Sequence, residues 1–351
     1  GIVAEKNRVC RFGGSSLQGP ESLNKVSRLI ALHSKQSRLY IIVSALKGST
    51  DALLAISRNG PGQALEQLDV LIDRHLRTAR ALLDGQRTEA WQNDTAAYVT
   101  VCRKILGKTK RSKFDTASIL ALGEKLSAAL LNQVLQRDLL DSTWLCSEAL
   151  IKTTGNALKA SVDIVSTQTA FQGLESNTSP TQLTLITGFC GGDSKGRTTL
   201  LGRNASDYSA ALVARFTRSQ TLHIIGDTEG ILSADPDYVP GAASISRLSW
   251  QDALLLARAG SGVLHPRTVE PLIEAGISLR LDDLNQSGGT HIGGAFNQRR
   301  QSLIATWRPP LQGILSKTQA LPQPLSKWQK QSPDNGVVSV FLADHLDAKV
   351  C

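Results

Sequence analysis

Short apolar segments alternate with polar turns in the first part of the chain. Residues 9–12 predict a strand that runs into the Gly-Gly-Ser-Ser turn at 13–16, and residues 21–33 have helical periodicity. Residues 39–46 form a nearly continuous apolar run, which is typical of a buried parallel strand. A second glycine- and serine-containing turn at 47–50 then leads into another helical segment. This repeated order of strand, turn and helix predicts an α/β fold with a largely parallel sheet.

The remaining pattern divides into three stretches. Residues 62–140 have helical spacing throughout, and we expect most of their leucines to be core. Further strands are then expected at 183–186, 198–201, 221–225 and 277–281, and further helices at 207–216, 250–259 and 267–275. From about residue 293 the chain is polar, basic and proline-containing, with one more expected strand at 337–342. We therefore predict a domain of residues 1–292 and a short region of residues 293–351.

Composition narrows the class of protein. With 351 residues, 41% hydrophobic and 20% charged, the chain is typical of a globular protein. It has no run of 18 apolar residues, so we expect no membrane partner, and its first ten residues lack the apolar stretch of a secretory signal. A cytoplasmic location is the expectation.

The five cysteines are odd in number, widely spaced and without a Cys-x-x-Cys motif, which favours reduced, buried thiols over disulfides or a zinc site.

The net charge of +9 is suited to phosphate-bearing partners. The densest basic cluster is at residues 108–113, and no aromatic side chain interrupts it. Nucleic-acid surfaces usually combine basic runs with aromatics, so we interpret this cluster as a solvated loop between helices and expect no nucleic-acid partner.

The stretch around Arg203 and Asp207 carries the most chemistry. It places an arginine and an aspartate, separated by small residues, where a loop is expected to enter a helix. Helix N-termini attract anions, and an arginine there can clamp a carboxylate. The alternative is an ordinary helix cap at Ser206 with a solvated arginine.

Two turns follow adjacent predicted strands. The successive N–H groups of Gly13, Gly14 and Ser15 can form an anion nest, and the segment from Ser44 to Thr50 offers hydroxyls to a small polar substrate. The alternative in each case is a tight turn that caps a helix. Because ligands of open α/β sheets bind where strands end, the pair of turns is more informative than either alone.

Three other motifs have an ordinary structural interpretation as well as a chemical one. Residues 191–198 nearly match a phosphate-binding Walker A loop, but a strand follows where a helix is required, so we interpret them as a hairpin turn. The segment containing Asp227, Gly230 and Asp235 follows another expected strand and predicts either a nucleotide site or a surface turn. His265 precedes a proline, has no nucleophile motif near it, and is interpreted as structural.

In order along the chain, these motifs resemble the aspartate kinases of the amino-acid kinase family, most of all the kinase half of bifunctional aspartokinase–homoserine dehydrogenases. The resemblance covers residues 9 to about 292. The motifs that carry it are Phe12-Gly13-Gly14-Ser15-Ser16, Ser44-Ala45-x-x-Gly48-x-Thr50, Leu122-Gly123-Glu124-x-Leu126-Ser127-Ala128, Gly202-Arg203-x-x-Ser206-Asp207-Tyr208, Asp227-x-x-Gly230, Asp235-Pro236, Val263-Leu264-His265-Pro266 and Gly289-Thr290.

The resemblance implies a three-layer α/β/α sandwich with a short C-terminal region like a partial ACT module. It implies a role in amino-acid biosynthesis and the MgATP-dependent phosphorylation of the side-chain carboxylate of L-aspartate, by a homodimer. The implied roles are catalysis by Arg11 and Asp207; substrate binding by Ser44, Thr50, Glu124 and Arg203; and nucleotide or phosphate binding by Gly13, Gly14, Ser15, Asp227, Gly230 and Asp235. No metal ligands of the chain are implied.

Three positions depart from the family pattern. Arg11 stands where the family has lysine, Asp237 where it usually has arginine, and Gly262 where it often has lysine. An arginine is a planar fork and does not simply replace a lysine. Two alternatives to an aspartate kinase therefore stay open: a degenerate homologue that binds a ligand or partner with little turnover, and a kinase of another acidic substrate.

Overall fold

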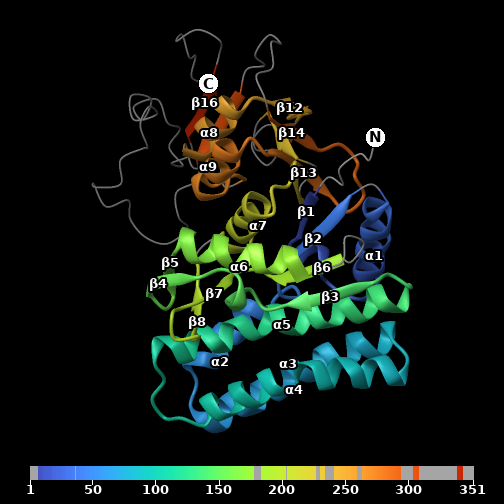
Figure 1. Ribbon diagram of the computed structural model, residues 1–351, viewed down its shortest axis with the longest axis vertical. Coiled ribbons are helices and arrows are strands. Elements are labelled where there is room, and N and C mark those ends of the chain that lie inside the picture. Colours follow the sequence, from blue (N-terminus) through green and yellow to red (C-terminus); the bar gives the residue numbers. More distant parts are fainter. Residues whose placement is uncertain are drawn as a thin grey trace. The chain divides into compact units, whose positions relative to one another are not determined.

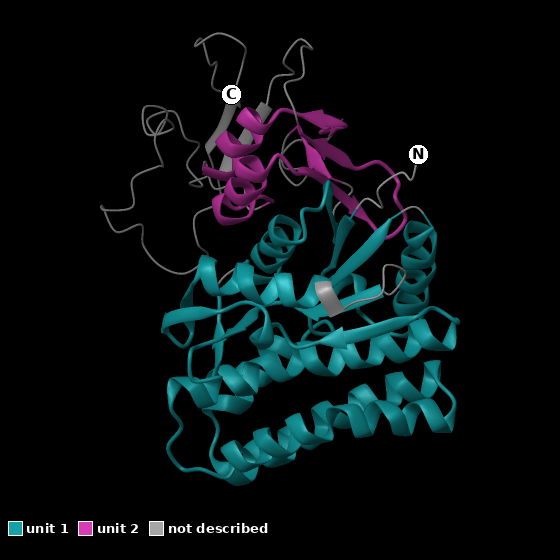
Figure 2. Ribbon diagram, viewed as in Figure 1, with its two compact units in different colours: residues 1–227 teal, residues 228–351 magenta. Residues whose placement is uncertain are grey.

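The computed structural model describes nine segments of the chain: residues 7–35, 37–177, 183–202, 204–226, 230–233, 241–258, 263–293, 303–307 and 338–342. The chain forms two compact units, residues 1–227 and 228–351 (Figure 2).

A parallel sheet forms the centre of the first unit (Figure 1). Its strands lie in the order β9-β1-β2-β6-β3, and every neighbouring pair is parallel. Their bounds are β1 Asn7–Phe12, β2 Arg38–Val43, β3 Ser142–Leu145, β6 Leu183–Thr187 and β9 Thr221–Gly226. Because the strands are parallel, their carboxyl ends meet at one edge of the sheet, and the segments that follow them are brought together there.

Helices flank this sheet, as the sequence predicts. They are α1 Pro20–Ser34, α2 Ser49–Arg58, α3 Pro61–Leu82, α4 Gly85–Leu106, α5 Lys113–Arg137, α6 Ile164–Asn177 and α7 Ala205–Phe216. Helix α5 packs against β2, β3 and β6, whereas α7 packs against β1, β2 and β9. Helices α3 and α4 form an additional layer beneath α5 (Figure 1). The prediction of an α/β fold with a largely parallel sheet is confirmed.

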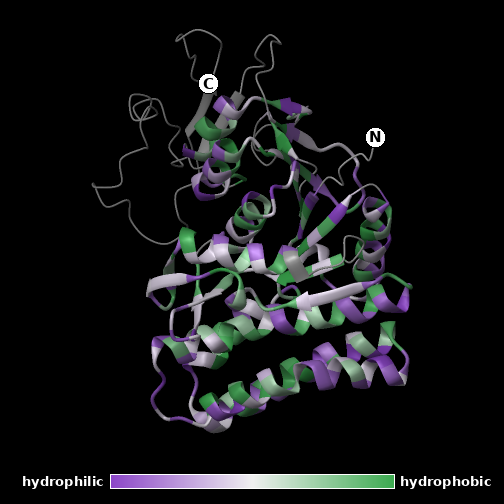
Figure 3. Cartoon of the chain, viewed as in Figure 1, coloured by the Kyte–Doolittle hydropathy of each residue, from purple (hydrophilic) through white to green (hydrophobic). Residues whose placement is uncertain are grey.

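Helix α5 carries part of the site and is buried along almost its whole length. A capping box starts it: Asp115 N donates to Ser112 Oγ, and Ser112 N donates to the Asp115 carboxylate. From Ala117 to Leu135 nearly every side chain is buried, because the sheet covers one side of the helix and α4 the other. Hydrophilic segments interrupt the hydrophobic ones along α5 in Figure 3, so the buried helix also carries polar side chains such as Glu124 and Lys125. The basic cluster at 108–113 is the loop between α4 and the start of α5, as predicted.

Short elements complete the first unit. They are the 3₁₀ turns η1 Gly14–Ser16 and η2 Ser147–Ala149, and the strands β4 Thr153–Asn156, β5 Lys159–Val162, β7 Cys190–Gly192 and β8 Thr198–Leu200. β4 pairs with β5, and β7 pairs with β8, both antiparallel. The hairpin interpretation of residues 191–198 is therefore confirmed.

The second unit contains short strands and two helices. Its elements are β10 Ile231–Leu232, β11 Ser244–Ile245, β12 Arg247–Leu248, α8 Trp250–Arg258, α9 Pro266–Ala275, β13 Ser278–Asp283, β14 Thr290–Ile292, β15 Leu303–Trp307 and β16 Val338–Leu342. β14 lies between β12 and β13, and β15 pairs with β16. His265 caps α9 by accepting a hydrogen bond from Arg267 N (3.2 Å), which confirms its structural role.

The cysteines behave as expected wherever the structure describes them. Cys10, Cys102 and Cys190 are buried free thiols and Cys146 is a half-buried one, while Cys351 lies outside the described residues. Within the same described segments, no helix is long and apolar enough to cross a membrane.

Candidate active site

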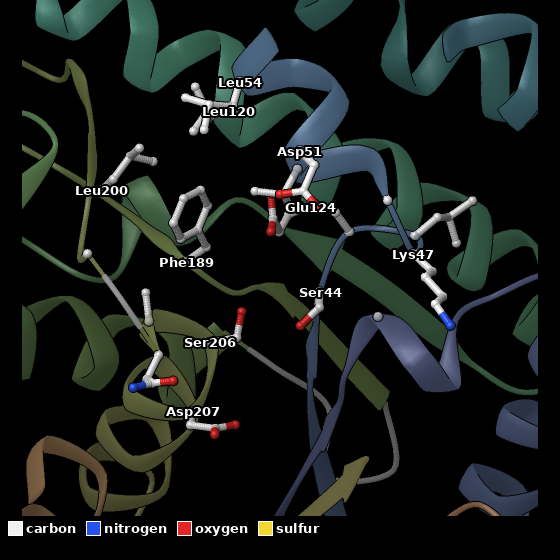
Figure 4. A pocket seen from close by; sticks show the side chains of 18 of the residues that line it. Ser44, Lys47, Asp51, Leu54, Leu120, Glu124, Phe189, Leu200, Ser206 and Asp207 are labelled. Atoms are coloured by element: carbon white, nitrogen blue, oxygen red, sulfur yellow. The ribbon is translucent and has the colours of Figure 1, made fainter. Parts of the chain in front are cut away.

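A cavity of about 720 Å³ lies in the first unit, where the segments after β1, β2 and β6 meet (Figure 4). Seven of the residues singled out from the sequence line it: Arg11, Gly14, Ser15, Ser44, Thr50, Glu124 and Asp207. Residues far apart in the sequence therefore share one site, as the order of motifs predicts.

The glycine turn after β1 forms one end of the cavity. Gly13 N donates to Ile225 O (3.1 Å), and Ser16 Oγ donates to the same oxygen (3.3 Å), so the turn is fixed to the end of β9. A Cβ at Gly13 would lie 2.7 Å from Arg11 Nη1, and one at Gly14 would lie 3.4 Å from Ala45 O. Gly13 is buried and does not line the cavity, whereas Gly14 and Ser15 do. The part of the turn that is open to phosphate oxygens is therefore at residues 14 and 15.

Arg11 and Asp207 form an ion pair at this turn. Arg11 Nε lies 3.1 Å from Asp207 Oδ1, and the two side chains are 18% and 26% exposed. Both atoms are buried and neither has a hydrogen-bond partner in the described part of the chain, so the contact is ionic. The pair holds the guanidinium beside Gly13.

The segment before α7 positions Asp207. Gly202 (φ 89°) and Asn204 (φ 53°) both have left-handed backbone, and Asn204 is the N-cap of the helix. The alternative in which Ser206 caps the helix is therefore wrong: Ser206 lies inside the first turn and lines the cavity. A Cβ at Gly188 would lie 2.9 Å from Ser206 Oγ, so this turn packs tightly against the end of β6. Arg203 lies outside the described residues.

The loop after β2 is held on both sides. Ser44 N donates to Phe12 O (3.3 Å), and Ser44 O accepts from Ser127 Oγ (2.5 Å). Ser44 Oγ is buried and has no hydrogen-bond partner among the described residues. Gly48 (φ 80°) then turns the chain into α2, which places Thr50 in its first turn. An unsatisfied hydroxyl facing a cavity is suited to a polar ligand, because leaving it unpaired costs free energy.

Glu124 supplies a buried carboxyl group to the same cavity. It is 3% exposed, and its Oε2 has no hydrogen-bond partner in the described segments. Burial raises its pKa to about 8, although hydrogen bonds from its own N–H and that of Ala45 act in the opposite direction. A Cβ at the preceding Gly123 would lie 2.8 Å from Ala45 Cβ, so the glycine lets α5 approach the loop. A ligand ammonium group at Glu124 would restore the charged carboxylate.

Next to Glu124, Lys125 joins a buried polar cluster. Its Nζ lies 2.6 Å from Glu148 Oε1 and 4.7 Å from the centre of the Tyr98 ring, and Thr198 Oγ1 donates to Glu148 Oε1 (3.0 Å). Burial alone would lower the pKa of Lys125, but the Glu148 carboxylate holds it above its usual value. The cluster ties α5 to η2 and β8.

Opposite the polar groups, the cavity has an apolar wall formed by Leu54, Leu120, Leu158, Phe189 and Leu200. Figure 4 shows Phe189 between Leu200 and Glu124. Phe189 has a φ of 76°, a conformation that bulky side chains rarely adopt. Sequence reasoning missed this wall, because its members look like ordinary core residues.

Two of the residues predicted to bind the nucleotide, Asp227 and Asp235, lie outside the described residues. Gly230 is described within the second unit. It has a φ of 111°, and a Cβ there would lie 2.6 Å from Thr290 Oγ1, so tight packing already requires glycine at this position. No group of three or more His, Cys, Asp or Glu residues suited to a metal ion occurs within the described segments.

Comparison with known proteins identifies the class of protein that this fold and site define. The chain belongs to the amino acid kinase family, whose family model matches residues 6–281. Its relatives include the aspartokinase of Chlamydia muridarum, with 30% identity over 273 residues, and the bifunctional aspartokinase/homoserine dehydrogenase of Haemophilus influenzae, with 29% identity over 282 residues. The predicted resemblance to aspartate kinases is confirmed.

The chain covers only part of these proteins. Each alignment includes 77% of this chain, but only 59% of the Chlamydia protein and 34% of the Haemophilus protein. Among solved structures, the Escherichia coli aspartokinase III in complex with aspartate and ADP matches with a TM-score of 0.75 and 26% identity, over 86% of this chain and 68% of that one. The amino-acid kinase fold predicted from the sequence is therefore confirmed.

Proposed function

We propose that this protein transfers the γ-phosphoryl group of ATP to the side-chain carboxylate of L-aspartate, giving 4-phospho-L-aspartate and ADP. The observation that carries the proposal is the shared cavity. It has a glycine cradle with an Arg11–Asp207 pair at one end, and the unpartnered Glu124 Oε2 and Ser44 Oγ beside it. The aspartate and ADP bound by the E. coli relative support the same substrates.

Four residues form the substrate side of the site. Glu124 receives the substrate ammonium group, and Ser44 and Thr50 donate hydrogen bonds to a carboxylate. Arg203 clamps a substrate carboxylate. These contacts orient the side-chain carboxylate towards the glycine turn, where its oxygen attacks phosphorus, so positioning contributes much of the rate.

The phosphate side combines backbone N–H groups with a fixed cation. Gly14 and Ser15 bind the transferring phosphoryl oxygens, and Arg11 neutralises their charge while Asp207 orients it. Gly13, whose N–H is donated to Ile225 O, shapes the turn and leaves room for the Arg11 guanidinium. Gly14 and Ser15 line the cavity in which the phosphoryl oxygens would lie. Asp227, Gly230 and Asp235 contact the nucleotide. Bound with ATP, Mg²⁺ would supply further charge neutralisation on its phosphates.

The organisation of the chain is proposed on the same basis. Residues 1–292 form the catalytic domain, and residues 293–351 form a partial ACT-like regulatory region or a linker. The active form is a homodimer, and the cytoplasmic location stays a prediction from the sequence.

A coupled assay for ADP release tests the proposed reaction. We expect ADP release that requires both Mg²⁺ and L-aspartate, with hydroxylamine trapping aspartyl hydroxamate. L-Glutamate and N-acetyl-L-aspartate serve as comparison substrates. Turnover with one of these but not with L-aspartate would support a kinase of another acidic substrate, and binding of L-aspartate without turnover would support a degenerate homologue.

A further inference from the structure

Lys47 is a second cation at the cavity. It is exposed, it lines the cavity, and it comes from the loop after β2. In the view of Figure 4 its ammonium group and Phe189 lie on opposite sides of Glu124 and Ser44. Lys47 is therefore remote from the apolar wall.

The backbone of Lys47 is fixed beside the glycine turn. Lys47 N donates to Leu17 O (3.1 Å), and Lys47 O accepts from Arg74 Nη2 (3.2 Å). A Cβ at Gly14 would lie 3.6 Å from the Lys47 Cα and 3.8 Å from its N. Lys47 therefore leaves the loop directly alongside the phosphate cradle, from a backbone that is hydrogen-bonded on both sides.

The two cations that line the cavity among the described residues, Arg11 and Lys47, differ in their charge balance. Arg11 is already paired with Asp207, whereas the Lys47 ammonium group has no ion-pair or hydrogen-bond partner in the described part of the chain. Lysine presents a compact charge on a flexible stem, which suits it to follow a group that moves between two oxygens. A transferring phosphoryl group is such a group, with charge spread over its oxygens.

We propose that Lys47 binds the phosphoryl group during transfer and stabilises the charge on its oxygens. The inference rests on the proposed function. The bond from the substrate carboxylate oxygen to phosphorus forms, the bond from phosphorus to the ADP oxygen breaks, and Lys47 keeps its protons while donating hydrogen bonds. Lys47 thus adds a positive charge to a site in which Arg11 is shared with Asp207.

Steady-state kinetics of three variants test this role. Lys47→Gln should lower kcat by a factor of about 10 to 100 with a small change in KM for L-aspartate, because the lost interaction is with the phosphoryl group. Lys47→Arg should retain most of the activity, since it keeps the charge. The matched control is Lys104→Gln, which removes an exposed lysine from α4 away from the cavity and should leave kcat unchanged. A kcat of Lys47→Gln within about twofold of wild type would overturn the inference.

Calorimetry separates this inference from the proposed function. If the wild-type protein shows no turnover with L-aspartate, the proposed function fails. The role of Lys47 is then tested by the affinity of the protein for MgATP alone. We then expect Lys47→Gln to bind MgATP at least about tenfold more weakly than wild type and Lys104→Gln. Equal affinities of the three proteins would overturn the assignment of Lys47, whatever the substrate.

Discussion

At the residue scale, the site depends on glycines, which have no side chain, as much as on the polar side chains that line it. The motif Phe12-Gly13-Gly14 was visible in the sequence, and so was Asp207. The resemblance implies that they meet, but local pattern alone does not, because the ion pair of Arg11 and Asp207 joins positions almost 200 residues apart and depends on the order of strands. The residue pattern did not predict the left-handed backbone of Phe189.

Gly13→Ala tests whether the position of Arg11 matters. The new Cβ would lie 2.7 Å from Arg11 Nη1 and would force the guanidinium away from the turn. We expect kcat to fall by a factor of about 10 to 100, since small misplacements of catalytic groups are costly. The control is Gly62→Ala in α3, where a Cβ meets nothing within 4 Å, and its kcat should match wild type. Wild-type kcat in Gly13→Ala would show that the position of Arg11 is unimportant.

Glu124 makes the free energy of unfolding of the protein depend on pH. Its pKa is raised from 4.5 to about 8, so between these values the folded protein keeps a proton that the unfolded chain releases. The contribution of this group to the free energy of unfolding therefore falls as pH rises from about 4.5 to 8. Glu124→Gln cannot ionise and should be progressively more stable than wild type over this range.

Urea denaturation at pH 5.5 and pH 8 measures this difference. We expect the stability of Glu124→Gln relative to wild type to be greater at pH 8. A difference that is the same at both values would mean that Glu124 titrates as an ordinary exposed carboxyl group.

At the scale of the element, α5 organises the site. The spacing of its leucines predicted the helix, but an apolar pattern cannot show which face meets the sheet and which meets α4. It also could not show that Lys125 pairs with Glu148, since the partner lies on a separate turn, η2. Adjacent residues of one helix thus serve different purposes: Glu124 lines the cavity, and Lys125 anchors the helix.

Lys125→Met should destabilise the fold by about 3–5 kcal/mol, because it leaves Glu148 as an uncompensated buried carboxylate. The two side chains are only 9% and 14% exposed, so solvent screens the pair little. Adding Glu148→Leu to this variant should recover much of the loss. Thermal and urea unfolding measure both.

The control for this pair is Lys25→Met, which breaks the exposed pair of Lys25 and Glu21 on α1. We expect a change of at most about 1 kcal/mol there. Equal losses in Lys125→Met and Lys25→Met would show that the Lys125–Glu148 pair does not anchor α5.

At the scale of the whole molecule, the alternation of strands, turns and helices was enough to predict a parallel α/β sheet and the edge at which the site lies. The strand order β9-β1-β2-β6-β3 was not predictable from local pattern, because order is decided by contacts between distant segments. The stacking of α3 and α4 beneath α5 was not predictable from local pattern either, because it also depends on contacts between distant segments. The cavity lined by the residues proposed to bind substrate lies within the first unit, so the proposed substrate half of the site can be tested without nucleotide.

L-Aspartate alone should raise the melting temperature, because a ligand that binds only the folded state stabilises it, by about 2.7 kcal/mol at 100 times its Kd. L-Alanine, which lacks the side-chain carboxylate, should give no shift, and Glu124→Gln should lose the response to L-aspartate. Equal shifts with L-alanine and L-aspartate would contradict the assigned pocket.

Oxygen-18 transfer tests the central claim most directly. L-Aspartate labelled with oxygen-18 in its side-chain carboxylate is incubated with MgATP and the protein, and hydroxylamine then cleaves the acyl phosphate at its carbonyl carbon. The account predicts inorganic phosphate that carries a single oxygen-18 atom, because the carboxylate oxygen attacked phosphorus. Phosphate without the label, or none above the level without protein, would contradict it.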